Sequence, residues 1–109
     1  MTLKDIVKQY FMDFSNKDIL SLEKAFADNI VLRDWEIEAN GIDSVIAASK
    51  NIFNNVNTIT VEIQNLYQEN NIVIGEIKII LNQSETLNVV DIFEFNQKGD
   101  IERIFAYKG

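Results

Sequence analysis

Three polar residues, Tyr10, Asp34 and Asp91, occupy positions that the surrounding pattern otherwise gives to apolar side chains. In the segment Thr86–Phe95, Asp91 is the one acidic residue in an odd-numbered row of apolar side chains. Alternate residues of a strand share a face, so this carboxyl group is predicted to lie in an apolar layer. Burial penalises the charged form of a carboxyl group, so we expect Asp91 to have a raised pKa and to remain protonated.

Asp34 and Tyr10 repeat this pattern on other elements. In the short segment that ends at Asp34, the even positions are Ile30, Leu32 and Asp34, so the carboxylate shares the more apolar face. Tyr10 lies in the apolar stripe of the first predicted helix, where its hydroxyl is expected to find a buried partner. Each residue also has an ordinary structural explanation. Tyr10 could be a core residue, and Asp34 could turn into solvent at the end of its strand. Asp91 could lie beside a β-bulge that turns its side chain to the surface. Three inward polar groups from three elements instead favour one cavity, in which one carboxyl group acts as an acid and the other as a base.

The composition limits the chemistry available to such a cavity. The chain of 109 residues contains no His and no Cys, so acid–base chemistry has to use carboxylates, Tyr or Lys. We expect no metal ion and no cofactor, because no loop has the spacing of a calcium site and no glycine-rich loop opens a helix. The net charge of −7 repels phosphates and anionic lipids, which disfavours nucleic acid and membranes as partners.

The whole chain, residues 1–109, is predicted to form one domain. Its length fits a single core, and it contains no proline and no linker-like segment. It has neither a run of eighteen apolar residues nor an apolar leader at the N-terminus. We therefore expect no membrane span, no signal peptide and a cytoplasmic location.

Helical periodicity predicts three helices in the first half of the chain. The first begins after Thr2, a good N-cap with Asp5 as a weaker capping-box partner, and ends near Ser15. A second helix is predicted at about 17–27 and a third from about 42 to 55. The stripe of the first helix consists of residues at the spacing i, i+3, i+4, i+7, i+8, i+11: Leu3, Ile6, Val7, Tyr10, Phe11 and Phe14.

The second half of the chain alternates with the period of a strand. A short strand at 30–34 precedes the third helix, and four successive strands follow residue 56. The connections are short and rich in Asn, Gln and Gly, which favours antiparallel hairpins. A chain with helices in its first half and successive antiparallel strands in its second half is typical of an α+β domain, in which the helices pack on one face of a curled sheet. The four strands are predicted at Thr58–Tyr67, Ile72–Leu81, Thr86–Phe95 and Ile101–Tyr107.

The strand Thr86–Phe95 is apolar on both faces. The helices can cover only one face of the sheet, so Val90 and Ile92 on the other face are expected to be buried in a symmetric homodimer. The alternative is that strong curvature hides both faces within one molecule.

Two stretches of the sequence resemble bacterial ketosteroid isomerases and SnoaL-like proteins of the nuclear transport factor 2-like superfamily. They are Phe26–Asp34, which is followed by Gly41, and Leu87–Phe95, which is followed by Gly99. The resemblance covers nearly the whole chain. It implies a cystatin-like, cone-shaped α+β barrel, with three N-terminal helices packed on a strongly curved, mainly antiparallel sheet.

The resemblance also implies a role for each of the three polar residues. Tyr10 precedes Asp34 by 24 positions, the spacing of the isomerases' oxyanion tyrosine to their catalytic base, and Asp91 precedes Gly99 by 8. Asp34 is then the base, while Tyr10 and protonated Asp91 donate hydrogen bonds to the enolate oxygen of a small apolar carbonyl compound. Ketosteroid isomerase is itself the standard example of a carboxylic acid that is kept neutral to donate a hydrogen bond.

The sequence departs from the isomerases at two pocket positions, and two alternatives to an isomerase or cyclase remain open. Ser49 stands where the isomerases carry a second tyrosine, and Trp35 where they usually carry proline. One alternative is a module of the same fold that only binds a small ligand or dimerises. The other is a hydrolase or dehydratase of the same superfamily. It is weakened by the lack of His and because Arg33, the one Arg near either Asp, is predicted to point to the opposite face.

Overall fold

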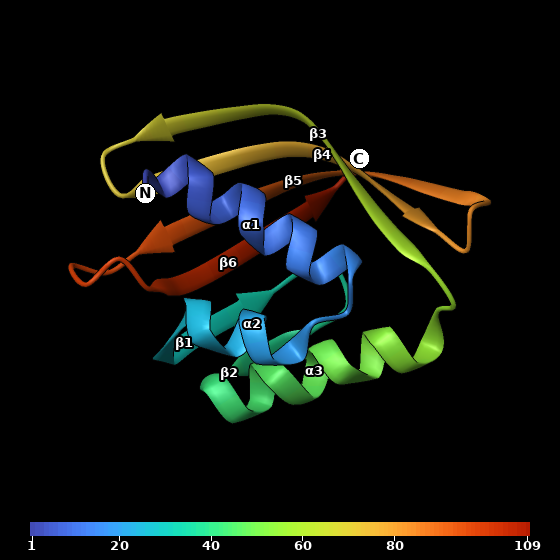
Figure 1. The fold of residues 1–109 in the computed structure, drawn as a ribbon, viewed down its shortest axis with the longest axis horizontal. Helices are drawn as coiled ribbons and strands as arrows, with labels where there is room; N and C mark the ends of the chain where they lie inside the picture. Colours follow the sequence, from blue (N-terminus) through green and yellow to red (C-terminus); the bar gives the residue numbers. More distant parts are fainter.

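Three helices cover one face of a six-stranded sheet in the computed structural model, which describes residues 1–109 (Figure 1). The strand order is β2-β1-β6-β5-β4-β3, with β1 and β6 parallel and every other neighbouring pair antiparallel. The predicted α+β fold with a mainly antiparallel sheet is confirmed, although the sheet is not closed into a complete barrel. The helices are α1 (Leu3–Ser15), α2 (Ile19–Ala25) and α3 (Ile42–Asn55). The strands are β1 (Phe26–Arg33), β2 (Glu38–Asn40), β3 (Ile59–Glu69), β4 (Ile72–Leu81), β5 (Glu85–Phe95) and β6 (Ile101–Lys108).

Helix α1 begins at the predicted capping box. The Thr2 hydroxyl accepts the Asp5 backbone N–H at 3.1 Å, and the Asp5 carboxylate accepts the Thr2 backbone N–H at 3.3 Å. These bonds satisfy donors that the first turn of a helix leaves free. The helix buries Val7, Tyr10 and Phe11, which confirms the predicted stripe. None of the three helices has the length and apolar character needed to cross a membrane.

The predicted bounds of the second helix and of the first strand were wrong. Helix α2 was predicted at about 17–27 but spans Ile19–Ala25, and its N-cap is Asp18, whose carboxylate accepts the Ser21 backbone N–H at 3.2 Å. Lys17 before it has a φ of 56°, which is outside the helical region. Strand β1 begins at Phe26 instead of Ile30, and its pairing with β6 shifts register within this segment. Strand β2 was not predicted, since three residues are too few to show a period.

Gly75 of β4 brings α1 close to the sheet. It pairs with Asp91 of β5, and a Cβ atom at this position would lie 3.3 Å from the Phe11 ring and 3.4 Å from the Leu66 side chain. A distance of 3.3 Å is shorter than an ordinary carbon–carbon contact. The lack of a side chain at Gly75 therefore allows Phe11 to pack directly over the strand beside Asp91.

Candidate active site

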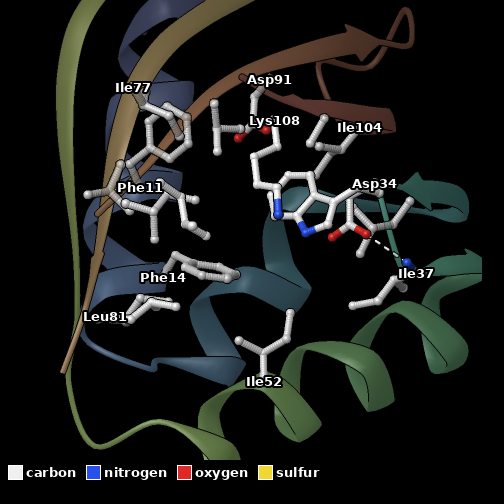
Figure 2. Close-up of a pocket in the computed structure, with 18 of the residues that line it drawn as sticks. Phe11, Phe14, Asp34, Ile37, Ile52, Ile77, Leu81, Asp91, Ile104 and Lys108 are labelled. Atoms are coloured by element: carbon white, nitrogen blue, oxygen red, sulfur yellow. Dashed lines mark hydrogen bonds between the residues drawn. The ribbon is translucent and has the colours of Figure 1, made fainter. Parts of the chain in front are cut away.

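A cavity of about 350 Å³ lies between the helices and the inner face of the sheet (Figure 2). Of the 22 residues that line it, 16 are hydrophobic, counting Tyr10 and Trp35. This is the composition expected of a site for a small, largely apolar ligand. All three residues singled out in the sequence, Tyr10, Asp34 and Asp91, line this one cavity. The remaining polar residues of the lining are Glu36, Ser49, Glu85 and Lys108.

Asp91 lies on the inner face of β5, as its phase in the strand predicts. Its side chain is 8% exposed, and its carboxyl group makes no hydrogen bond within the chain. The Asp91 oxygens are not completely buried, and the surface that they keep faces the cavity. Burial, and secondly the negative charge of Asp34, raises the pKa of Asp91 to about 7. A substantial fraction of this carboxyl group is therefore protonated, and able to donate a hydrogen bond, near neutral pH.

Tyr10 projects from α1 toward the same strand. Its ring packs edge-on against Phe93 at 5.3 Å and Phe11 at 5.6 Å between ring centroids. Burial, and secondly the charge of Asp91, raises the pKa of Tyr10 well above its usual range, so the hydroxyl stays protonated. We expected a buried partner for this hydroxyl, and that prediction was wrong: the hydroxyl makes no hydrogen bond within the chain. The hydroxyl borders the cavity, where it can donate a hydrogen bond to a ligand.

Asp34 follows directly after β1 and belongs to a tight turn. Its Oδ1 atom accepts the backbone N–H of Glu36 at 2.8 Å. The same atom accepts the backbone N–H of Ile37 at 2.7 Å (Figure 2). Its own backbone N–H donates to the Ile37 carbonyl at 2.9 Å. The prediction that Asp34 is the last residue of the strand was wrong, because the strand ends at Arg33. The turn instead fixes one carboxylate oxygen and leaves Oδ2 without a partner in the chain, in a residue that lines the cavity.

The sheet register sets the separation of the two carboxyl groups. Asp91 of β5 pairs with Ala106 of β6, and Arg33 of β1 pairs with Phe105. Asp34 follows Arg33 and therefore lies next to Ala106 on the other side of β6. Strands are about 4.8 Å apart, so the backbones of Asp34 and Asp91 are separated by about 10 Å. The small side chain of Ala106 between them leaves space for a ligand that contacts both carboxyl groups.

Ser49 is buried in α3 and borders the cavity, but its hydroxyl is already used. It donates to the Val45 carbonyl one turn earlier, at 3.0 Å. A serine in this bond has no second proton to donate to Tyr10. The support that the isomerases obtain from a second tyrosine therefore has no counterpart at this position.

Three charged residues of the lining were missed in the sequence. Lys108 alternates with Ile104 and Ala106 along β6, so the period of the strand could have placed it on the inner face. Glu36 belongs to the turn after β1 and Glu85 begins β5, and neither position carries a periodic signal. No group of three or more His, Cys, Asp or Glu side chains lies close enough to hold a metal ion.

The sequence matches the model of one protein family. The family model described as the SnoaL-like domain matches residues 7–104. The chain belongs to the SnoaL-like domain family. This confirms the resemblance seen in the sequence and places the domain in the nuclear transport factor 2-like superfamily. Among curated proteins, none matches the sequence.

Solved structures share the fold of this SnoaL-like domain at low sequence identity. An NTF2-like protein of unknown function from Cytophaga hutchinsonii is 14% identical, with a TM-score of 0.85 over 100% of this chain and 91% of its own. An LEH-like epoxide hydrolase from M. tuberculosis is 17% identical, with a TM-score of 0.85 over 98% of this chain and 82% of its own. A Kribbella flavida protein assigned as a ketosteroid isomerase is 11% identical, with a TM-score of 0.85 over 98% of this chain and 77% of its own. These similarities show a common fold, which hosts different activities.

Proposed function

We propose that this SnoaL-like domain catalyses proton transfer next to the carbonyl group of a small apolar substrate, as an isomerase or cyclase. The observation that carries the proposal is the combination of groups at one cavity. The Tyr10 hydroxyl and the Asp91 carboxyl have no partner within the chain, and the Asp34 carboxylate lines the same apolar space. Two free donors and one carboxylate are the set that an enolisation reaction requires.

In the proposed reaction, Asp34 removes a proton from the carbon next to the carbonyl group. The electrons of that C–H bond form a carbon–carbon double bond, and the carbonyl oxygen takes the negative charge. Tyr10 and protonated Asp91 donate hydrogen bonds to this oxygen, and these bonds strengthen as its charge develops. In an isomerisation, Asp34 then returns the proton to a different carbon, so that the double bond moves and the carboxylate is regenerated.

The experiment that tests this proposal replaces the base. Asp34→Asn keeps the size of the side chain, and its amide oxygen can still accept the backbone N–H groups of Glu36 and Ile37. It cannot accept the substrate proton, so turnover of a β,γ-unsaturated ketone should be nearly abolished while ligand affinity is mostly kept. Several enone scaffolds should be assayed, because Trp35 and Ser49 change the shape of the cavity relative to the isomerases.

One observation favours a ligand-binding module without catalysis as the second candidate. Oδ1 of Asp34 is held by two backbone N–H groups, which gives the carboxylate a structural role in the turn. Wild-type protein that binds such ketones but shows no Asp34-dependent turnover would favour this candidate. A hydrolase is less well supported, since no arginine lines the cavity and the Arg33 guanidinium stacks 4.0 Å from the centre of the Phe105 ring.

We also propose a homodimer that forms through the outer face of the sheet. Support comes from the register, which aligns apolar side chains in a row across four strands on the face opposite the helices. Val90 and its cross-strand partner Tyr107 are 38% and 53% exposed beside this row. A second copy that covers them would remove apolar surface from water. The row consists of Tyr67, Ile74, Ile92 and Phe105.

A further inference from the structure

Lys108 is the one cationic residue among those that line the cavity. It pairs with Val89 of β5 and lies two residues after Ala106, so both side chains are on the inner face of β6. Lys108 is exposed and Trp35 beside it is half-exposed, so the two mark the opening of the cavity. Figure 2 shows Lys108 extending into the same space as Asp34 and Asp91.

The ammonium group of Lys108 is positioned but not neutralised by the protein. It lies 5.3 Å from the centre of the Trp35 ring, within the range of a cation–π contact. Although acidic residues line the same cavity, Lys108 forms no ion pair, and the salt bridge of the chain joins Arg103 to Glu94 elsewhere. An ammonium group in this arrangement keeps its N–H donors available for a ligand.

We infer that Lys108, held by Trp35, is a specificity-determining residue that selects substrates with a carboxylate group. The substrate would then be a small carbonyl acid, with its carbonyl oxygen at Tyr10 and Asp91 and its carboxylate at Lys108. This inference deepens the proposed function and rests on it, because the same cavity holds the ligand.

The sheet geometry sets the size of such a ligand. Lys108 follows Ala106, the partner of Asp91, by two residues, which corresponds to about 7 Å along the strand. The apolar lining between these positions suits a hydrocarbon segment that separates the two oxygen-bearing groups. A neutral carbonyl oxygen can also accept a hydrogen bond from the ammonium group, but a carboxylate gains in addition the attraction between opposite charges.

The acidic residues that line the cavity reduce its affinity for an anionic ligand only in part. Glu36 and Glu85 are exposed, so water and salt screen their charges. Asp91 has its pKa raised to about 7 by burial and by Asp34, and it is protonated in a substantial fraction of molecules at neutral pH. Asp34 is then the principal opposing charge, and it lies about one strand spacing from β6.

Binding of matched neutral and charged probes tests the inference without turnover. The probes are 4-hydroxybenzoate and 6-hydroxy-2-naphthoate, each compared with its methyl ester by titration calorimetry. Their phenol group mimics an enol toward Tyr10 and Asp91, and the two acids bracket the expected length. Lys108→Met keeps an unbranched apolar side chain and removes the charge, and Lys108→Arg keeps the charge. Lys78→Met is the matched control, because Lys78 is an exposed β4 residue outside the cavity lining.

For at least one pair, we expect wild-type protein to bind the acid up to about fivefold more tightly than the ester. Lys108→Met should lose this preference mainly through weaker binding of the acid, and Lys108→Arg and Lys78→Met should keep it. An unchanged preference in Lys108→Met, esters that bind wild type as tightly as the acids, or no binding of any probe would each overturn the inference. Failure of the proposed function is seen separately, as ketone turnover that does not depend on Asp34.

Discussion

The buried carboxyl group of Asp91 should make the stability of this domain decrease as the pH rises. Burial, and secondly the charge of Asp34, raises the pKa of Asp91 from 3.8 to about 7 in the folded protein. In the unfolded chain the group returns to its ordinary value, so the folded state binds the proton more tightly. The stability contributed by this proton is fully present below about pH 4, is lost as the pH rises to about 7, and does not change further above that.

The magnitude follows from the same pKa values. At about 1.4 kcal/mol per pKa unit, the rise from 3.8 to about 7 corresponds to about 4 kcal/mol in the free energy of unfolding. Asp91→Asn keeps the size and polarity of the side chain but cannot ionise. The difference in stability between variant and wild type should therefore shift in favour of the variant by several kcal/mol between acidic and mildly alkaline pH.

Urea denaturation followed by circular dichroism at several pH values from about 5 to about 8 gives the required free energies. Glu69→Gln, at the exposed end of β3, is the control for the loss of one negative charge from the surface. The pH dependence that all proteins share cancels when each variant is compared with wild type at the same pH. A difference between Asp91→Asn and wild type that is the same at every pH would refute the argument that Asp91 is buried and ionisable.

Two further predictions concern activity and assembly. Asp91→Ala should lower kcat/KM for a β,γ-unsaturated ketone about a hundredfold, because one hydrogen bond to the developing enolate is lost. Asp91→Asn should cost less, since its amide can still donate, and equal losses in the two variants would contradict this role. Val90→Lys places a charge in the proposed interface, so sedimentation velocity at micromolar concentration should show a monomer where wild type forms a dimer. Wild-type protein that sediments as a monomer would contradict the proposed interface.

The helices and strands with a regular spacing of apolar residues could be predicted from the sequence, because that spacing decides which side chains face the core. The bounds of β4 and α3 agree with the prediction, as do the capping box of α1 and the inward direction of Asp91. Each depends on residues within a few positions of one another, and their spacing decides which face is buried.

The parts that could not be predicted depend on contacts between distant segments or on loop geometry. The turn at Asp34 is defined by two N–H donors in the loop that follows, and no period marks such bonds in a sequence. The Tyr10 hydroxyl has no partner within the chain because it borders the cavity, whose extent is set by all the elements around it. Strand β1 starts early because its first residue, Phe26, pairs with Ile101 of β6, at the far end of the chain.

The parallel pairing of β1 with β6 has a consequence for the order in which this protein folds. The strands β3 to β6 can form one after another, since each pairs with its neighbour in the sequence. Joining β1 to β6 instead closes a loop that contains most of the chain, and we expect this non-local pairing to form more slowly than the hairpins. Strand β6 lies between β1, which Asp34 follows, and β5, which carries Asp91, so these two residues come together only when β6 has paired with both strands. We therefore expect a ribosome-bound chain whose last strand has not yet emerged to lack the proposed site, so that ligand binding would be the last property that the newly made protein acquires.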